Sequence, residues 1–306
     1  MQGVDALRTP EEAFARVPDF GYPPKYVDEL RGFEGLRLAF IDEGPRDARA
    51  VFLCLHGTPT WSFLYRKMIP VFLTGGGRVV VPDLFGCGRS DKPVDETIHT
   101  FRFHYDALLR LIEHLDLQRI TLVVQGVGGM LGLTLPPETP ARFARLLAMN
   151  TALVAGDVPL GDNLLAWRDF ASREPDLDVA AFMKAATPIL GETEADAYAA
   201  PFPDRRYKAA IPGLARVIPT EPSADGALLA RRARAWWRTA WSGPAFLAVG
   251  LRMPFLAAPA MEYLRSVIRD APQPVVYSEG GFYLPEWGDE VARAALEAFA
   301  RWEPTV

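Results

Sequence analysis

Three glycines that follow an apolar run are the first residues in the chain whose spacing could serve a cofactor. The segment reads Gly126-Val127-Gly128-Gly129 after ITLVVQ, and a helix-like stretch follows it. A dinucleotide site requires the pattern G-x-G-x-x-G and an acidic residue at the end of the next strand. Here Leu131 replaces the third glycine, and Asn150 ends the next apolar run. The pattern therefore argues against a nucleotide, and we expect no cofactor.

Side chains that usually perform acid–base or nucleophilic chemistry are unevenly distributed. The four histidines all lie early in the chain, at His56, His99, His104 and His114. The two cysteines, Cys54 and Cys87, are too few for a disulfide framework, and no neighbouring base is visible that would activate either thiol. We therefore expect reduced, packed thiols and no metal site.

The elements that must position these residues follow an alternating rhythm. Short apolar runs recur at 36–42, 50–57, 78–83, 120–126, 146–151, 245–250 and 274–279. Near-continuous apolar strands separated by helical segments are typical of a parallel sheet that is covered on both faces. Helices are expected at 103–117 and 289–302, where apolar residues recur three and four positions apart. The fold class is therefore α/β, with a doubly wound sheet.

One long segment breaks the rhythm. Between about 155 and 230 the sequence becomes rich in Ala, Pro, Trp and acidic residues, with helical stretches at 176–187 and 192–200. The simplest interpretation is a helical cap at 155–230, inserted into a main domain formed by residues 1–154 and 231–306.

Composition and charge exclude several classes of function. The 306 residues carry 33 basic and 38 acidic side chains, and the formal charge of -5 gives no broad field for nucleic acid. No apolar run approaches the roughly 20 residues that a membrane span requires, so no membrane partner is expected. The N-terminal MQGVDALRTPEEAF contains early acids and no apolar core of a secretory signal, which predicts a cytoplasmic protein.

Loop and strand segments throughout the chain resemble those of one enzyme family. The similarity covers HGTPTWSFLYRKMIP at 56–70, the stretch at 79–125, EADAYAAPFPD in the expected cap and WGDEVARAALEAF near the end. Several of these segments lie on loops, where the fold alone does not dictate the sequence. Over nearly its whole length the chain is similar to the haloalkane dehalogenases, which implies an α/β-hydrolase fold with a helical cap.

That resemblance also implies where the catalytic residues belong. Haloalkane dehalogenases attack carbon with a carboxylate on the sharp turn between a strand and a helix, and a histidine then activates the water that cleaves the ester. The family's turn reads V-Q-D-W-G-G, whereas this chain reads V-Q-G-V-G-G at 124–129. Gly126 therefore stands in the position of the nucleophile, and Val127 replaces a tryptophan that binds halide.

The positions of the acid and the base are changed as well. The acid belongs three residues after Gly250, where this chain has Met253, and the alternative acid position is Asn150. The base belongs in a loop after the last strand, where Phe282 stands, and no histidine follows His114. Because the fold takes its base from that loop, serine and cysteine hydrolase chemistry is excluded on the same ground. The resemblance predicts a degenerate member of the family that does not hydrolyse haloalkanes.

Five residues are expected to surround a ligand in the remaining pocket. Trp167 matches a second halide-binding tryptophan of the family, and Thr58 follows its oxyanion-loop motif. The full set is Thr58, Val127, Trp167, Phe282 and Tyr283. Free N–H groups at the helix start favour a small anion, whereas the aromatic and aliphatic side chains favour a small apolar molecule.

Three functions remain open on the sequence alone. The first is a non-catalytic protein that binds a small apolar or anionic ligand, or that serves as the partner subunit of another protein. The second is an enzyme that reuses the pocket for chemistry requiring only enclosure and orientation, such as a cofactor-independent cyclase or lyase. The third is weak hydrolysis by a water that Glu286, Tyr283 or backbone donors hold.

Overall fold

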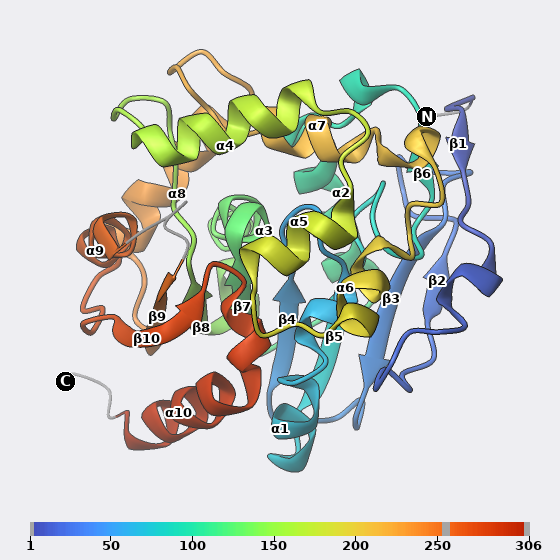
Figure 1. Cartoon of the computed structure of the whole chain (residues 1–306). Helices are drawn as coiled ribbons and strands as arrows, with labels where there is room; N and C mark the ends of the chain where they lie inside the picture. Colours follow the sequence, from blue (N-terminus) through green and yellow to red (C-terminus); the bar gives the residue numbers. More distant parts are fainter. Residues whose placement is uncertain (1–2, 253–257, 303–306) are drawn as a thin grey trace.

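An eight-stranded, mostly parallel sheet forms the centre of the structure (Figure 1). The structure is a computed structural model, and it describes residues 3–252 and 258–302. The strand order is β10-β9-β8-β7-β4-β5-β3-β2, in which β3 runs antiparallel to both neighbours. The strands are β2 (Lys25–Val27), β3 (Leu38–Glu43), β4 (Val51–Leu55), β5 (Arg78–Pro82), β7 (Ile120–Gln125), β8 (Phe143–Met149), β9 (Ala245–Arg252) and β10 (Val275–Gly281). Two further short strands, β1 (Ala6–Leu7) and β6 (Lys92–Pro93), pair with each other.

The central strands are apolar because helices cover both of their faces. Every residue of β4, β5 and β7 is buried, which explains why these strands are continuous apolar runs and do not alternate. All seven predicted strands are present, and the predicted doubly wound α/β class is confirmed. The edge strand β2 was not predicted, because two of its three residues are exposed and leave no apolar signal.

Five helices flank the sheet in the main part of the chain. They are α1 (Ile69–Thr74), α2 (Phe101–His114), α3 (Gly126–Gly132), α9 (Ala258–Val267) and α10 (Gly288–Arg301). α1 packs against α10, and α2 packs against α3. Within the described ranges, none of the helices is long and apolar enough to cross a membrane.

A second group of helices lies over the carboxyl ends of the central strands (Figure 1). It comprises α4 (Asp162–Arg173), α5 (Val179–Ala186), α6 (Glu192–Ala199), α7 (Ala210–Arg216) and α8 (Ala227–Thr239). The predicted end of the cap at residue 230 falls inside α8, an Ala- and Arg-rich helix that continues for nine more residues without a break, from 231 to 239. The structure thus contains the expected helical insertion, while its division into domains stays a prediction.

A buried ion pair ties this insertion to the main part. Arg66, just after the short helix η2 (Ser62–Tyr65), donates from both terminal nitrogens to Glu286, over 2.6 and 2.8 Å. Arg66 also donates to Glu194 of α6 over 2.6 Å, and the Tyr198 hydroxyl donates to Glu286. Two-pronged contacts of this kind fix orientation as well as charge. One guanidinium therefore joins three segments that are far apart in the sequence.

Candidate functional site

The turn between β7 and α3 keeps the close packing of a nucleophile elbow. Gly126 has a φ of +54°, a left-handed backbone conformation that favours glycine. A Cβ on Gly128 would lie 2.3 Å from the carbonyl oxygen of His56, and one on Gly129 would lie 2.1 Å from the side-chain oxygen of Thr151. These two glycines are therefore required for α3 to approach β4 and β8.

At Gly126 itself the surroundings are less crowded. A Cβ built there would lie 3.4 Å from Cζ of Phe282 and 3.8 Å from Cα of Gly57, which are ordinary contacts. The carbonyl oxygen of Gly126 accepts a hydrogen bond from the Thr151 hydroxyl over 2.7 Å. Space for the first atom of a side chain remains, although no side chain is present.

Asn150, at the alternative position of the acid, has a structural contact. It follows β8 and is fully buried. Its Oδ1 accepts from the Gly250 N–H over 2.8 Å, and its Nδ2 donates to the Gly250 carbonyl over 3.0 Å. An amide can do both, whereas a carboxylate can only accept. Asn150 therefore joins β8 to β9, and Met253, the other expected acid position, lies outside the described residues.

Phe282, at the position of the base, follows β10 and points its ring towards the elbow. Its side chain is 7% exposed, and its carbonyl oxygen accepts from Gln125 Nε2 over 3.0 Å. The next residue, Tyr283, is fully buried and donates to the carbonyl oxygen of Thr58 over 3.2 Å, and burial raises the pKa of its phenol. The loop that supplies a base in related hydrolases is therefore held by hydrogen bonds but carries no base.

A very small cavity lies between the elbow and α4. Its volume is about 10 Å³, and it is lined by Gly57, Thr58, Gly126, Val127, Met130, Leu164, Trp167, Ile218 and Phe282. Roughly 10–15 Å³ on this measure is what one water molecule requires. Four of the five predicted ligand residues meet here, whereas Tyr283 is not among the lining residues, because its hydroxyl turns to the Thr58 backbone.

Among the residues that the structure describes, no ionisable side chain lines this cavity. One polar side-chain atom on the wall is the Thr58 hydroxyl, which is buried without a hydrogen-bond partner in the described part of the chain. The cavity can therefore enclose a water molecule, and the described residues on its wall carry no carboxylate or imidazole.

None of the four histidines is among the described residues that line the cavity. His56 is buried, donates from Nδ1 to the Gly57 carbonyl over 2.7 Å and accepts from the Leu84 N–H over 3.0 Å. Burial lowers the pKa of His56, so its ring is neutral and spans two loops. His99 and His104 are buried next to each other near the start of α2, with 3.2 Å between Nδ1 and Nε2. His114 is in the last turn of the same helix.

Glu286, a candidate for holding a hydrolytic water, contacts the buried Arg66 and its neighbours. Its carboxylate contacts Arg66, Tyr198 and, over 3.1 Å, Lys67, and its side chain is 0% exposed. It is not among the residues that line the cavity. These contacts leave Glu286 a role in holding the cap and the main part together.

The thiols are also unsuited to chemistry. Cys54 and Cys87 are free and buried, as expected, and burial raises the pKa of Cys87 to about 12. A thiol with that pKa is almost entirely protonated at neutral pH. No group of three or more His, Cys, Asp or Glu side chains in the described ranges could hold a metal ion.

Sequence reasoning missed a second hollow, a groove of about 510 Å³ beside α4. Its walls come from residues 152–164 and from the start of α9 at 259–263. No motif marks it, because its two walls lie about a hundred residues apart and consist of ordinary apolar side chains. The run of exposed Val158 and Pro159 before α4 was the one available signal.

Comparisons with known proteins agree with this architecture. The alpha/beta hydrolase fold family matches residues 50–246. The chain is 44% identical over 219 residues to the haloalkane dehalogenase of Psychrobacter cryohalolentis, which covers 71% of this chain and 72% of that protein. It is 35% identical over 297 residues to the haloalkane dehalogenase of Mycolicibacterium paratuberculosis, covering 96% and 98%.

The structural similarity is as extensive. The tetrameric haloalkane dehalogenase of Paraglaciecola agarilytica NO2 matches with a TM-score of 0.93 and 45% sequence identity. The match covers 98% of this chain and 100% of that one. Together with the strand order, this confirms the α/β-hydrolase fold.

Proposed function

Because this chain belongs to the haloalkane dehalogenase family of the α/β-hydrolase superfamily, we propose that it has lost the family's hydrolytic reaction and acts by binding a small apolar molecule. One observation carries the proposal. The cavity over Gly126, which corresponds to the place of the nucleophile in the resemblance, is lined by no ionisable side chain of residues 3–252 and 258–302. Covalent hydrolysis requires a nucleophile and a base within reach of the substrate.

The size of the cavity supports the loss of hydrolysis. With a volume of about 10 Å³, it has room for one water molecule and none for a haloalkane. The ring of Phe282 occupies the space towards the elbow from the loop after β10. A protein that has lost the nucleophile and the base has no need of an open substrate pocket, and here the Phe282 ring fills that space.

Halide release from the purified natural protein tests the proposal directly. We expect no release from 1,2-dibromoethane or 1-bromobutane, and no cleavage of p-nitrophenyl acetate, above a heat-denatured control. Saturable turnover of either bromide would contradict the proposal and would mean that an unrecognised group acts as nucleophile. The same assay run on the dehalogenase of Psychrobacter cryohalolentis gives the positive control.

A restored variant tests whether the scaffold still supports the old reaction. Gly126→Asp, Val127→Trp, Met253→Asp and Phe282→His are introduced together, with the triple variant that keeps Gly126 as the matched control. We expect halide release by the quadruple variant only, because the carboxylate introduced at position 126 is the nucleophile that forms the ester. A folded quadruple variant without activity would show that the pocket has changed beyond the replaced side chains.

Self-association is a second proposal, and it is favoured by one exposed edge. β10 is the edge strand of the sheet, and its Val275 and Val276 are 41% and 56% exposed. Exposed apolar edges invite pairing with another chain, and a relative at 45% identity is described as tetrameric. We expect a molar mass in solution above that of the monomer, which light scattering measures. A monomer at all concentrations would contradict it.

The proposed location is the cytoplasm. Cys54 and Cys87 are both free, and unpaired thiols are typical of a reducing compartment. Fractionation of cells that express the natural protein from its own promoter should recover it in the cytoplasmic fraction.

A further inference from the structure

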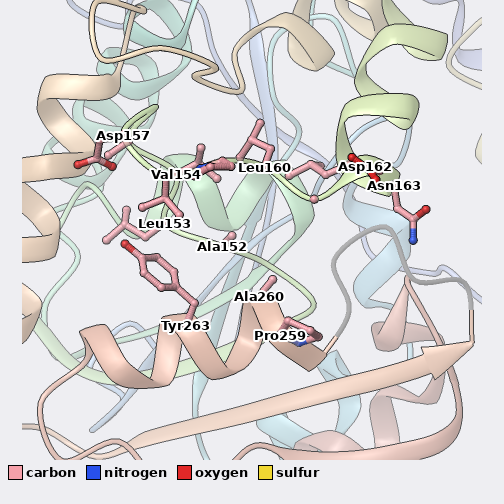
Figure 2. A pocket seen from close by; sticks show the side chains of 15 residues that line it. Ala152, Leu153, Val154, Asp157, Leu160, Asp162, Asn163, Pro259, Ala260 and Tyr263 are labelled. Carbon is pink, nitrogen blue, oxygen red and sulfur yellow. The ribbon is translucent and has the colours of Figure 1, made fainter.

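The groove of about 510 Å³ is separate from the small cavity over Gly126. Figure 2 shows it between the segment that leads into α4 and the first turns of α9. Its volume falls in the range of roughly 300–1,000 Å³ that is typical of small-molecule sites. Among the described lining residues, Leu164 alone belongs to both hollows. A molecule larger than water therefore has room on the outer side of Leu164 and not on its inner side.

The walls of the groove are mainly apolar. Leu153, Val154 and Leu160 line one side, and Pro259 and Ala260 of α9 line the other (Figure 2). Apolar surface that a ligand removes from water contributes about 25 cal/mol for each Å². The groove therefore favours a hydrocarbon body.

One end of the groove carries a fixed pair of polar groups. Asp157 and Tyr263 lie together there, and Figure 2 shows them at the same end. Arg234 of α8 donates from Nη1 to Asp157 Oδ1 over 3.0 Å and to the Tyr263 hydroxyl oxygen over 3.0 Å. Its other terminal nitrogen donates to the second carboxylate oxygen. At the opposite end, Asp162 and Asn163 are exposed on the first turn of α4.

The hydrogen bonds at this end decide what kind of head group fits. Because Tyr263 accepts from Arg234, its own hydroxyl hydrogen is directed elsewhere and can be donated to a ligand. The contact with Arg234 lowers the pKa of Asp157, so that its carboxylate is ionised at neutral pH and accepts hydrogen bonds. The end of the groove thus offers one donor and one acceptor side by side.

Charge excludes two other head groups. A carboxylate ligand would meet the Asp157 carboxylate, and an ammonium ligand would meet the Arg234 guanidinium. Because these two side chains neutralise each other, neither sign of charge gains a net attraction. A neutral hydroxyl, which both accepts and donates, matches Tyr263 and Asp157 together.

We propose that this groove binds a neutral alcohol with a mainly apolar body, whose hydroxyl accepts from Tyr263 and donates to Asp157. The inference rests on the proposed function, since it names the site and the chemistry of the small molecule that the protein would bind. Leu164 forms the inner wall and keeps the ligand out of the cavity over Gly126.

Calorimetric titration with three probes of one chain length tests the head group. The probes are octan-1-ol, octanoate and octylammonium, added to the natural full-length protein. We expect saturable binding of the alcohol, with at least tenfold weaker binding of both charged probes. Equal affinity for the three probes, or no saturable binding of the alcohol, would overturn the assignment.

Variants of the lining residues test whether the alcohol binds in this groove. Tyr263→Phe removes the donated hydrogen and is expected to weaken octan-1-ol binding about tenfold, or about 1.4 kcal/mol. Ala260→Trp fills the groove and is expected to abolish binding. The matched control is Tyr26→Phe, on β2 at the far edge of the sheet. It removes a hydroxyl that is hydrogen-bonded to Glu11, and this variant should bind octan-1-ol like the parent.

The two proposals fail in different assays. Alcohol affinity that is unchanged in both groove variants would place the ligand elsewhere, while the loss of hydrolysis would still stand on the halide assay. Haloalkane turnover by the natural protein, with the three groove results as expected, would overturn the loss of hydrolysis and leave the alcohol site in place.

Discussion

The ring of Phe282 faces Gly126, so that a Cβ on Gly126 would lie 3.4 Å from Cζ of Phe282. In hydrolases of this fold the nucleophile and the base meet across this gap. Gln125, the residue before Gly126, donates from Nε2 to the Phe282 carbonyl over 3.0 Å and holds the two loops together. The two loops are thus held together around a glycine and a phenylalanine, neither of which carries a group that transfers protons.

Gly126→Ala and Gly128→Ala should differ in stability. At Gly126 the added Cβ meets only ordinary contacts, but a φ of +54° strains any L side chain, so we expect a loss of about 1 kcal/mol in the free energy of unfolding. At Gly128 the Cβ would lie 2.3 Å from a backbone oxygen, so the loss should be several times larger. Urea denaturation measures both. Equal losses would show that α3 shifts away from β4 at little cost.

Asn150→Asp should destabilise the protein in a pH-dependent way. The buried amide donates to the Gly250 carbonyl, and a carboxylate at that site would face this oxygen without a hydrogen to offer. We expect a loss of about 2–4 kcal/mol at pH 8. Because burial raises the folded-state pKa of the new carboxyl above its unfolded value of about 3.9, the loss should shrink as pH falls towards 5.

The exposed Asn163→Asp is the control for that substitution. Asn163 lies on the first turn of α4 and is exposed, so its change to a carboxylate should move the unfolding midpoint little at either pH. A pH-independent loss in Asn150→Asp would mean that the new carboxylate finds a compensating donor near Gly250.

Glu286→Gln separates a structural role from a catalytic one. The substitution removes the fully buried one of the two carboxylates that Arg66 contacts and leaves Glu194, so we expect a loss of about 3 kcal/mol in unfolding free energy. Any slow ester cleavage by the natural protein should be unaffected at a temperature where both proteins are folded. Loss of such cleavage in Glu286→Gln, with little change in stability, would identify Glu286 as a base after all.

The fold was predictable because its buried strands leave a strong apolar signal. β4, β5 and β7 are buried along their whole length, and short apolar runs in the sequence predict all three. β2 was not predicted, since an exposed edge strand leaves little apolar signal. The cap boundary at residue 230 stays a prediction, and this residue lies inside α8.

The site was predictable only in part. The residue types at Gly126 and Phe282 predict that the family's nucleophile and base are replaced. The structure places both residues on the wall of the same cavity. The closure of that cavity depends on side-chain packing between distant segments, which no local pattern encodes. Arg66 illustrates the same limit, because its partners Glu194 and Glu286 lie 128 and 220 residues away in the sequence.

Stability should fall as the solution is acidified below pH 6.5, because His99 is buried and neutral. Its Nε2 donates to the Pro93 carbonyl over 3.1 Å, so Nδ1 must accept from Nε2 of His104, and a proton on Nδ1 would break that bond. Burial lowers the pKa of His99 to about 4, below the unfolded value of about 6.5. The unfolded chain therefore binds the proton first, and stability is lost as pH falls between these values.

The expected loss from His99 is about 2 kcal/mol between pH 8 and pH 5, and burial lowers the pKa of His104 in the same direction. Urea denaturation at several pH values measures the slope, and a reversible return to pH 8 shows that the protein was not damaged. His114, in the last turn of α2, supplies the control, since His114→Gln should keep the slope of the natural protein. A stability that stays constant from pH 8 to pH 5 would mean that the buried pair opens to water and titrates normally.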